Sequence, residues 1–94
     1  MDYSTKLLSE IEEMAQNLTP VSEIGVLLGL KNDEYRQFLD DVATVGSDVW
    51  EAFHKGKAWA AMEIRKRDIE LAKAGSPSAV DALRLHLRMM DDTK

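Results

Sequence analysis

The stretch LTPVSEIGVLLGLKNDEYRQFL, Leu18 to Leu39, carries the signals for two short helices joined by a tight turn. The Thr-Pro pair at 19–20 predicts a helix start, with Pro20 at the first helical position, where its missing N–H costs nothing. The helix runs to about residue 28 and stops at Gly29, because glycine readily ends a helix in left-handed geometry. Asn32 or Asp33 then caps a second helix. This spacing predicts a bihelical unit.

The letters EIGVLLGL within this stretch are similar to the EIAxxLG signature of the helix–turn–helix motif, with Gly25 in place of the usual alanine. A small residue is expected where the two helices cross, and apolar residues where each helix faces the core. The expected core positions are Ile24, Leu28, Leu30, Tyr35, Phe38, Leu39 and Val42. Helical proteins that bind no DNA use the same packing, so a purely structural role stays open.

Helical periodicity continues on both sides of this unit, and no window shows the alternation of a strand. An apolar stripe predicts a preceding helix with Ser4 as its cap, and its members are Leu7, Leu8, Ile11, Met14, Ala15 and Leu18. Residues 46–48 break the pattern, and Ser47 starts a long helix that reaches about residue 74, with Gly56 permitting a close crossing. The run Gly75-Ser76-Pro77 ends it and starts a last helix, which reaches about residue 90 before a tail, 91–94, that is expected to fray.

We therefore predict an all-α fold, in which an N-terminal helix–turn–helix of three short helices precedes a long antiparallel helical hairpin. The helix–turn–helix module would occupy residues 1–46 and the hairpin residues 47–90, together forming one domain, as suits 94 residues.

Both hairpin helices carry more than one apolar stripe, and the hairpin itself accounts for one of them. The second stripe is covered either by another copy of the chain or by the three-helix unit folding back over it. In the first case we expect a homo-oligomer. Its interface residues would be Trp50, Phe53, Trp59, Met62, Ile69, Leu85 and Met89.

Charge is unevenly distributed along the chain, whose net charge is −5. Residues 1–48 carry a net charge of −7 and residues 49–94 carry +2, so the front half repels DNA at long range. If the second helix of the motif enters a major groove, its outward DNA-binding residues are Lys31, Asn32, Arg36 and Gln37. A second basic group comprises Lys55, Lys57, Arg65, Lys66 and Arg67. It either follows a DNA backbone or forms a solvated face paired with nearby acids.

Signals for catalysis are weak. The chain has no cysteine, and its two histidines, His54 and His86, lie on different predicted helices, so we expect no metal site and no cofactor. No serine stands in a nucleophile-elbow context and no glycine loop is suited to phosphates, so we do not expect an enzyme. No apolar run is long enough to cross a membrane, and no secretion signal is evident, which favours a cytoplasmic location.

The run AFHKGKAWAAMEIRKRDIELAKAGSPSAVDALRLHL, Ala52 to Leu87, resembles the second half of phage terminase small-subunit-like proteins. These have an aromatic residue, a Gly-Lys/Arg pair and a long Ala/Glu-rich helix before a small-residue turn and a closing helix. The matching positions are Phe53, Gly56-Lys57, Ala58, Ala60-Ala61, Glu63, Leu71-Ala72, Gly75, Ala79 and Leu83. The resemblance spans about residues 18 to 88, and the helix–turn–helix lies where that family places one.

The resemblance implies a non-enzymatic DNA-packaging subunit that assembles into a ring, recognises viral DNA and assists a separate large terminase subunit inside a bacterial host cell. It implies that Lys31, Asn32, Arg36 and Gln37 face DNA and that the hairpin forms the oligomer interface. Two alternatives stay open. One is a helix–turn–helix transcriptional regulator of a phage or mobile element, and the other is an acidic protein-interaction adaptor that does not bind DNA.

Overall fold

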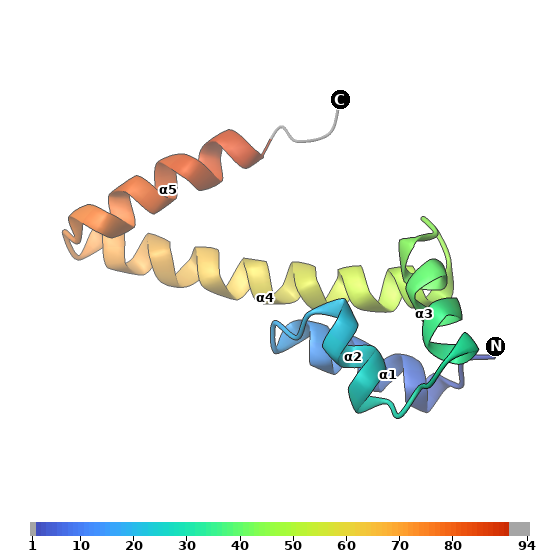
Figure 1. Cartoon of the computed structure of the whole chain (residues 1–94). Coiled ribbons are helices and arrows are strands. Elements are labelled where there is room, and N and C mark those ends of the chain that lie inside the picture. Colours follow the sequence, from blue (N-terminus) through green and yellow to red (C-terminus); the bar gives the residue numbers. More distant parts are fainter. Residues whose placement is uncertain (1, 91–94) are drawn as a thin grey trace. The chain divides into compact units, whose positions relative to one another are not determined.

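The protein is all-α over residues 2–90, the part that the computed structural model describes. Five helices follow one another: α1 (Thr5–Gln16), α2 (Val21–Leu27), α3 (Asp33–Ala43), α4 (Asp48–Lys73) and α5 (Pro77–Met89) (Figure 1). Residues 2–90 contain no strand, which confirms the predicted all-helical class. Within the same residues, no helix combines the length and the apolar character that crossing a membrane requires.

The chain divides into two compact units, Met1–Ala60 and Ala61–Lys94. α4 contributes to both, because its first turns bring Val49 and Ala52 into the core of the first unit. The sequence placed a boundary earlier, between residues 46 and 47. The assignment of separate functions to residues 1–46 and 47–90 stays a prediction.

The core of the first unit draws on all four of its helices. Fully buried side chains include Ile11 of α1, Ile24 of α2, Phe38 of α3 and Val49 of α4. Half-buried apolar side chains surround them: Tyr3, Leu7, Leu8, Met14, Val21, Leu28, Leu30, Leu39 and Phe53. The apolar positions expected from the helical spacing of α1 and α3 form this core except Leu18 and Tyr35; Tyr35 is half-buried, and its hydroxyl donates to the carbonyl of Ser22 at 3.3 Å. Burial of the core residues is the main stabilising contribution.

Two glycines permit close packing within the first unit, as the sequence predicted. A Cβ at Gly25 would lie 2.6 Å from Cε1 of Tyr35, so the absence of a side chain lets α2 meet the Tyr35 ring. A Cβ at Gly56 would collide with the backbone oxygen of Glu12 and lie 2.8 Å from Cβ of Ala15. Gly56 therefore brings the backbone of α4 against α1.

The end of α1 differs from the prediction, which extended its apolar stripe to Leu18. α1 stops at Gln16, and Leu18 adopts a left-handed φ of 64° with its side chain exposed. The N–H of Thr19 donates to the carbonyl of Met14 at 3.0 Å, and the N–H of Leu18 donates to that of Ala15 at 3.0 Å. These bonds satisfy the last carbonyls of the helix in the geometry that glycine usually adopts, so Leu18 takes the place of a C-terminal glycine.

The start of α2 is shifted by one residue from the prediction. Pro20 is the N-cap, with φ −62° and ψ 150°, and the helix begins at Val21 without a side-chain cap. α2 then ends at Leu27, and Gly29 has the expected left-handed φ of 77°. Asn32 precedes α3 as expected, but with a φ of 56° and no hydrogen bond from its side chain to the helix.

The later helix signals are confirmed. Ser47 accepts a hydrogen bond from the N–H of Trp50 at 3.0 Å and starts α4. Gly75 has φ 94°, Ser76 accepts from the N–H of Ala79 at 3.4 Å, and Pro77 opens α5. The tail that was expected to fray, residues 91–94, lies outside the described residues.

Candidate DNA-facing and self-association surfaces

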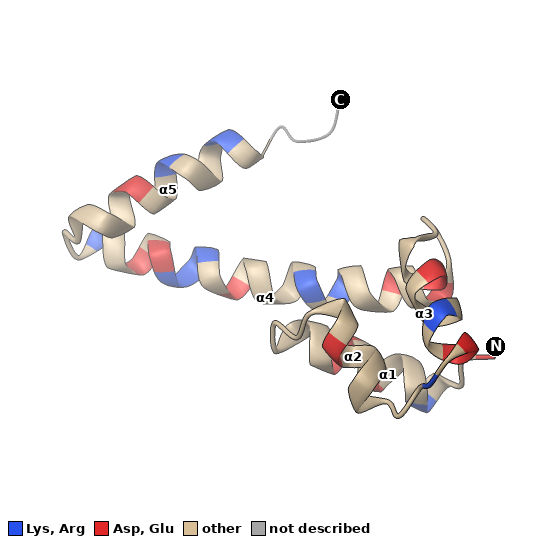
Figure 2. Ribbon diagram, in the orientation of Figure 1, with Lys and Arg blue, Asp and Glu red and all other residues tan. Residues whose placement is uncertain are grey.

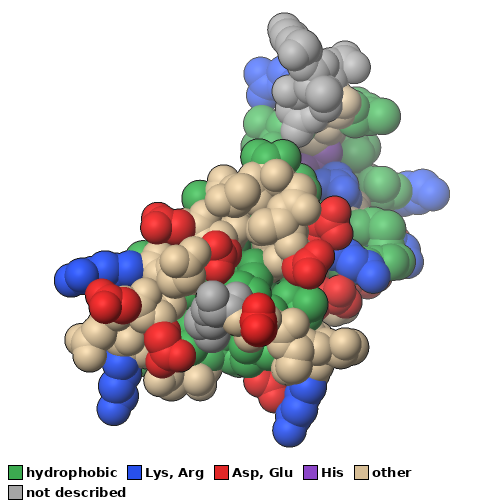
Figure 3. Space-filling model, turned by 90° about the vertical axis from the view of Figure 1, so that its right-hand side faces the viewer, with side chains coloured by type: hydrophobic (Ala, Val, Ile, Leu, Met, Phe, Trp, Pro, Cys, Tyr) green, Lys and Arg blue, Asp and Glu red, His purple; other side chains and the backbone are tan. Residues whose placement is uncertain are grey.

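The four residues predicted to face DNA gather at the start and on the outer face of α3. Lys31, Asn32, Arg36 and Gln37 are all exposed. Acidic residues are interspersed with them along α3, as the red and blue segments show (Figure 2). Acidic side chains are also spread over the face of the first unit seen in Figure 3. The surface that would meet DNA is therefore mixed in charge.

Two of these side chains are engaged by neighbouring carboxylates. Arg36 Nη1 lies 3.5 Å from Oδ1 of Asp33, and Gln37 Nε2 donates to Oδ1 of Asp41 at 2.8 Å. The other oxygen of Asp41 accepts from the hydroxyl of Tyr3 at 2.7 Å. A guanidinium or amide that reads a base edge must exchange such a partner for the base, and for the exposed Arg36–Asp33 pair this exchange costs little.

The second basic group is divided between the two units. Lys55 and Lys57 belong to the first unit, where Lys55 Nζ lies 3.7 Å from Oε1 of Glu12 on α1. Arg65, Lys66 and Arg67 belong to the second unit and are exposed. Lys66 Nζ lies 3.9 Å from Oε1 of Glu63, one of the pairs expected of a solvated helix face. Exposed pairs of this kind contribute little, so these lysines remain free to exchange partners.

The predicted interface residues in the first unit vary in exposure. Phe53 packs against the core, and Trp50 is half-buried with its ring 4.3 Å from that of His54. Trp59 is 45% exposed and is the one large apolar side chain among these that faces solvent extensively. The core contact of Phe53 explains part of its apolar character without any partner.

The second unit leaves most of its apolar side chains in solvent. Within residues 61–90 the one buried residue is Ala79. Of the predicted interface residues, Met62 is half-buried, and Ile69, Leu85 and Met89 are exposed. The structure adds exposed apolar residues that the predicted interface omitted: Ile64, Leu71, Leu87 and Met90. They lie on the apolar stripes of the sequence, so the same periodicity could have identified them.

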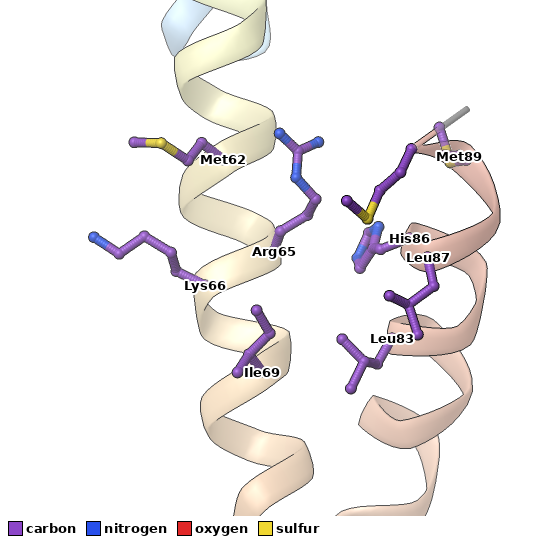
Figure 4. A pocket seen from close by; sticks show the side chains of 9 residues that line it. Met62, Arg65, Lys66, Ile69, Leu83, His86, Leu87 and Met89 are labelled. Carbon is purple, nitrogen blue, oxygen red and sulfur yellow. The ribbon is translucent and has the colours of Figure 1, made fainter. Parts of the chain in front are cut away.

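A groove of about 560 Å³ lies between α4 and α5 within the second unit. We call it the α4–α5 groove, and its lining residues are Met62, Arg65, Lys66, Ile69, Leu83, His86, Leu87, Met89 and Met90. Figure 4 shows Ile69, Leu83 and His86 between the two helices, with Met62 and Lys66 along the outer edge of α4. His86 Nε2 and Asp68 Oδ2 are 2.7 Å apart, and this hydrogen bond links the two helices.

Within residues 2–90, two ionisable groups have displaced pKa values, and both lie in the first unit. Burial raises the pKa of Tyr3, and the hydrogen bond to Asp41 and its negative charge raise it further. Burial lowers the pKa of His54, and the positive charge of Lys57 acts in the same direction. Tyr3 packs against the core, and the ring of His54 lies beside those of Trp50 and Phe53. Among the described residues, no group of three or more side chains could hold a metal ion.

Comparisons of this chain with protein-family models, with curated proteins and with solved structures found no match.

Proposed function

We propose that this protein is a non-enzymatic, self-associating DNA-binding subunit of the small terminase kind, acting in the cytoplasm of a bacterial host cell. In this proposal α2 and α3 form a helix–turn–helix module. The second half of α4 and α5 form the antiparallel hairpin through which copies associate, and a large terminase subunit would be a further partner.

The observation that carries the proposal is the lack of burial in the second unit. Two helices that bury one residue between positions 61 and 90 gain little from each other, and a helix of the length of α5 is marginal in water on its own. Exposed Ile64, Leu71 and Leu85 offer a flank on which a second copy could bury apolar surface. Association is the simplest source of the missing stability.

Association would also raise the affinity of the DNA-facing residues for DNA. One module with few cations binds DNA weakly, because phosphate neutralisation supplies most of the affinity. Several copies held together repeat the weak contact and raise the effective affinity. The proposal therefore links the two surfaces: the hairpin assembles copies, and α3 with Lys31 and Arg36 contacts DNA.

Self-association is tested by sedimentation velocity over a range of protein concentrations. We expect wild-type protein to be larger than a monomer, and Leu85→Glu to shift the population toward monomer because it places a charge on the apolar flank. Arg88→Glu is the matched control, since it changes more charge at an exposed position of the same helix. A wild-type protein that stays monomeric at high micromolar concentration rejects the proposal.

DNA binding is tested by fluorescence anisotropy with a labelled duplex at low salt, where electrostatic contacts are strongest. Arg36→Ala with Gln37→Ala should weaken binding about tenfold or more, the effect of losing two base-edge contacts. Lys6→Ala, which removes an exposed cation from α1, should change it little. Unchanged binding in the double variant removes α3 from the DNA-reading role.

The acidic adaptor is a second candidate, because Arg36 and Gln37 lie beside Asp33 and Asp41. Residues 1–60 also contain five Lys and Arg against eleven Asp and Glu, a net charge of −6. Such a surface suits a basic protein partner. Absence of DNA binding even at low salt, together with retained self-association, would favour this candidate over the packaging subunit.

A further inference from the structure

The α4–α5 groove differs in character from the other apolar side of the same unit. Its lining combines six apolar side chains with Arg65, Lys66 and His86, and among residues 2–90 no carboxylate lines it. Asp68, the nearby acid, is hydrogen bonded to His86. The groove is therefore apolar along its length and basic at its edge.

The apolar lining suits a helix rather than a small polar molecule. The space lies between two helices, and a third helix fills such a space by placing residues at i, i+3/4 and i+7 along it. Three of the lining residues are methionines, Met62, Met89 and Met90, whose flexible side chains adapt to the contour of a bound apolar surface.

The charges of the groove argue against a second copy placed symmetrically in the same groove. A twofold interface brings the same patch of each copy together, so Arg65 and Lys66 of one copy would meet a described lining that itself holds cations and no carboxylate. Like charges at an interface are unfavourable and suppress the wrong partner. An occupant with carboxylates beside its apolar stripe gains from the same two cations.

We propose that the α4–α5 groove is a docking site for an acidic amphipathic helix of a partner protein. The partner's apolar stripe packs on Ile69, Leu83 and Leu87, and its carboxylates pair with Arg65 and Lys66. The Glu63 carboxylate beside Lys66 is an exposed partner at 3.9 Å, so a bound carboxylate can replace it at little cost. This site goes beyond the proposed function, because its occupant is neither DNA nor another copy of the chain.

In this proposal Met62, Ile69 and Met89 of the predicted interface belong to the groove, and self-association uses the opposite flank. Ile64 and Leu71 are seven residues apart on α4 and share one side of it, as do Met62 and Ile69. At about 100° per residue, the two pairs face directions separated by roughly 140–180°. Leu85 is likewise displaced from Leu83 and Leu87 on α5. Copies can therefore associate through one flank while the groove stays open.

The probe for this site is a fluorescein-labelled designed peptide of about 18 residues, five helical turns, with leucines at i, i+3/4 and i+7 and glutamates beside them. The comparison peptide replaces every glutamate with lysine. Anisotropy titrations with full-length protein should show the acidic peptide binding about tenfold or more tightly than the lysine peptide. Equal binding of the two peptides overturns the proposal.

Charge reversal of the groove edge is the decisive variant, because both positions are exposed and neither contributes to a core. Arg65→Glu with Lys66→Glu should reverse the preference, so that the lysine peptide binds more tightly. Leu87→Glu should weaken binding of the acidic peptide about tenfold, whereas Leu71→Glu on the opposite flank should change it less than about twofold. A preference that survives the double reversal places the peptide elsewhere and overturns the proposal.

Sedimentation velocity of the same protein–peptide mixtures shows whether peptide binding in the groove and self-association use the same surface. If saturating acidic peptide leaves the oligomeric state unchanged, the groove and the association flank are independent, as proposed. If the peptide dissociates wild-type oligomers, a second copy occupies the groove and the proposal is wrong. Loss of self-association in Leu85→Glu with peptide binding retained would leave the groove assignment intact.

Discussion

Replacing Gly56 with alanine tests the close contact between α1 and α4 directly. Two effects oppose each other. Alanine favours a helix interior over glycine by about 1 kcal/mol. Its Cβ, however, would collide with the carbonyl oxygen of Glu12, lie 2.8 Å from Cβ of Ala15 and lie 3.0 Å from the backbone nitrogen of Gln16.

The obstructing atoms at Gly56 include backbone of α1, which cannot rotate away as the end of a long side chain can. Relief requires the two helices to separate, and overpacking of a core typically costs about 1–3 kcal/mol or occasionally more. The clash should exceed the gain in helix propensity. We expect Gly56→Ala to lower the free energy of unfolding by about 2 kcal/mol, equivalent to a fall in melting temperature of roughly 8–16 °C for a domain of this size.

The assay is urea unfolding followed by circular dichroism, with wild type and variant at one protein concentration because association shifts apparent stability. Ala58→Gly is the matched control, since Ala58 is exposed two residues further along the same helix. Ala58→Gly should lower the free energy of unfolding by about 1 kcal/mol through helix propensity alone. If Gly56→Ala instead stabilises the protein by about the amount that Ala58→Gly costs, the close approach of α1 and α4 is refuted.

Three further predictions concern the first unit. Leu18→Gly should raise stability by up to about 1 kcal/mol, because glycine adopts the left-handed backbone there without strain; thermal melting at fixed concentration measures the change, and a loss would contradict the assigned φ. Because the pKa of Tyr3 is raised above its ordinary value of 10, its contribution to the free energy of unfolding should be fully present below pH 10 and should decrease above it. Tyr3→Phe should abolish this decrease, and at neutral pH it should lower the free energy of unfolding by about 1 kcal/mol because the hydrogen bond to Asp41 is lost. Burial and the charge of Lys57 lower the pKa of His54, so the unfolded chain binds a proton at a higher pH than the folded protein does. The free energy of unfolding should therefore decrease as the pH falls below 6.5, the ordinary value. Urea midpoints measured at neutral and at mildly acidic pH should show this decrease, and His54→Asn should remove it.

Local chemistry explains which helix boundaries could be predicted. Ser4, Ser47 and Ser76 each accept a backbone hydrogen bond at a helix start, and a serine before an apolar run signals this in any context. Leu18 could not be assigned in the same way. Its left-handed backbone is fixed by the hydrogen bonds at the end of α1, and leucine gives no sequence signal for that conformation. The one-residue shift at Pro20 arises at the same junction.

The surroundings of the candidate DNA-facing residues were only partly visible in the sequence. The bond between Gln37 and Asp41 follows from their spacing of four on one helix. The bond between Asp41 and Tyr3 joins residues 38 positions apart, and the pair of Lys55 with Glu12 joins different helices. Such contacts depend on how the helices cross, which periodicity alone does not determine. The exposure of each side chain on α3 was predictable, whereas its competition for partners was not.

Acidic residues and exposed apolar residues are distributed unequally between the two units. The first unit buries Ile11, Ile24, Phe38 and Val49 in one core and carries all of the excess negative charge. The second unit, with seven Lys and Arg against six Asp and Glu in residues 61–94, is almost neutral and buries one residue in its described part. Repulsion between copies is therefore weakest where exposed apolar surface is greatest, since charge repulsion falls with net charge and apolar association grows with area.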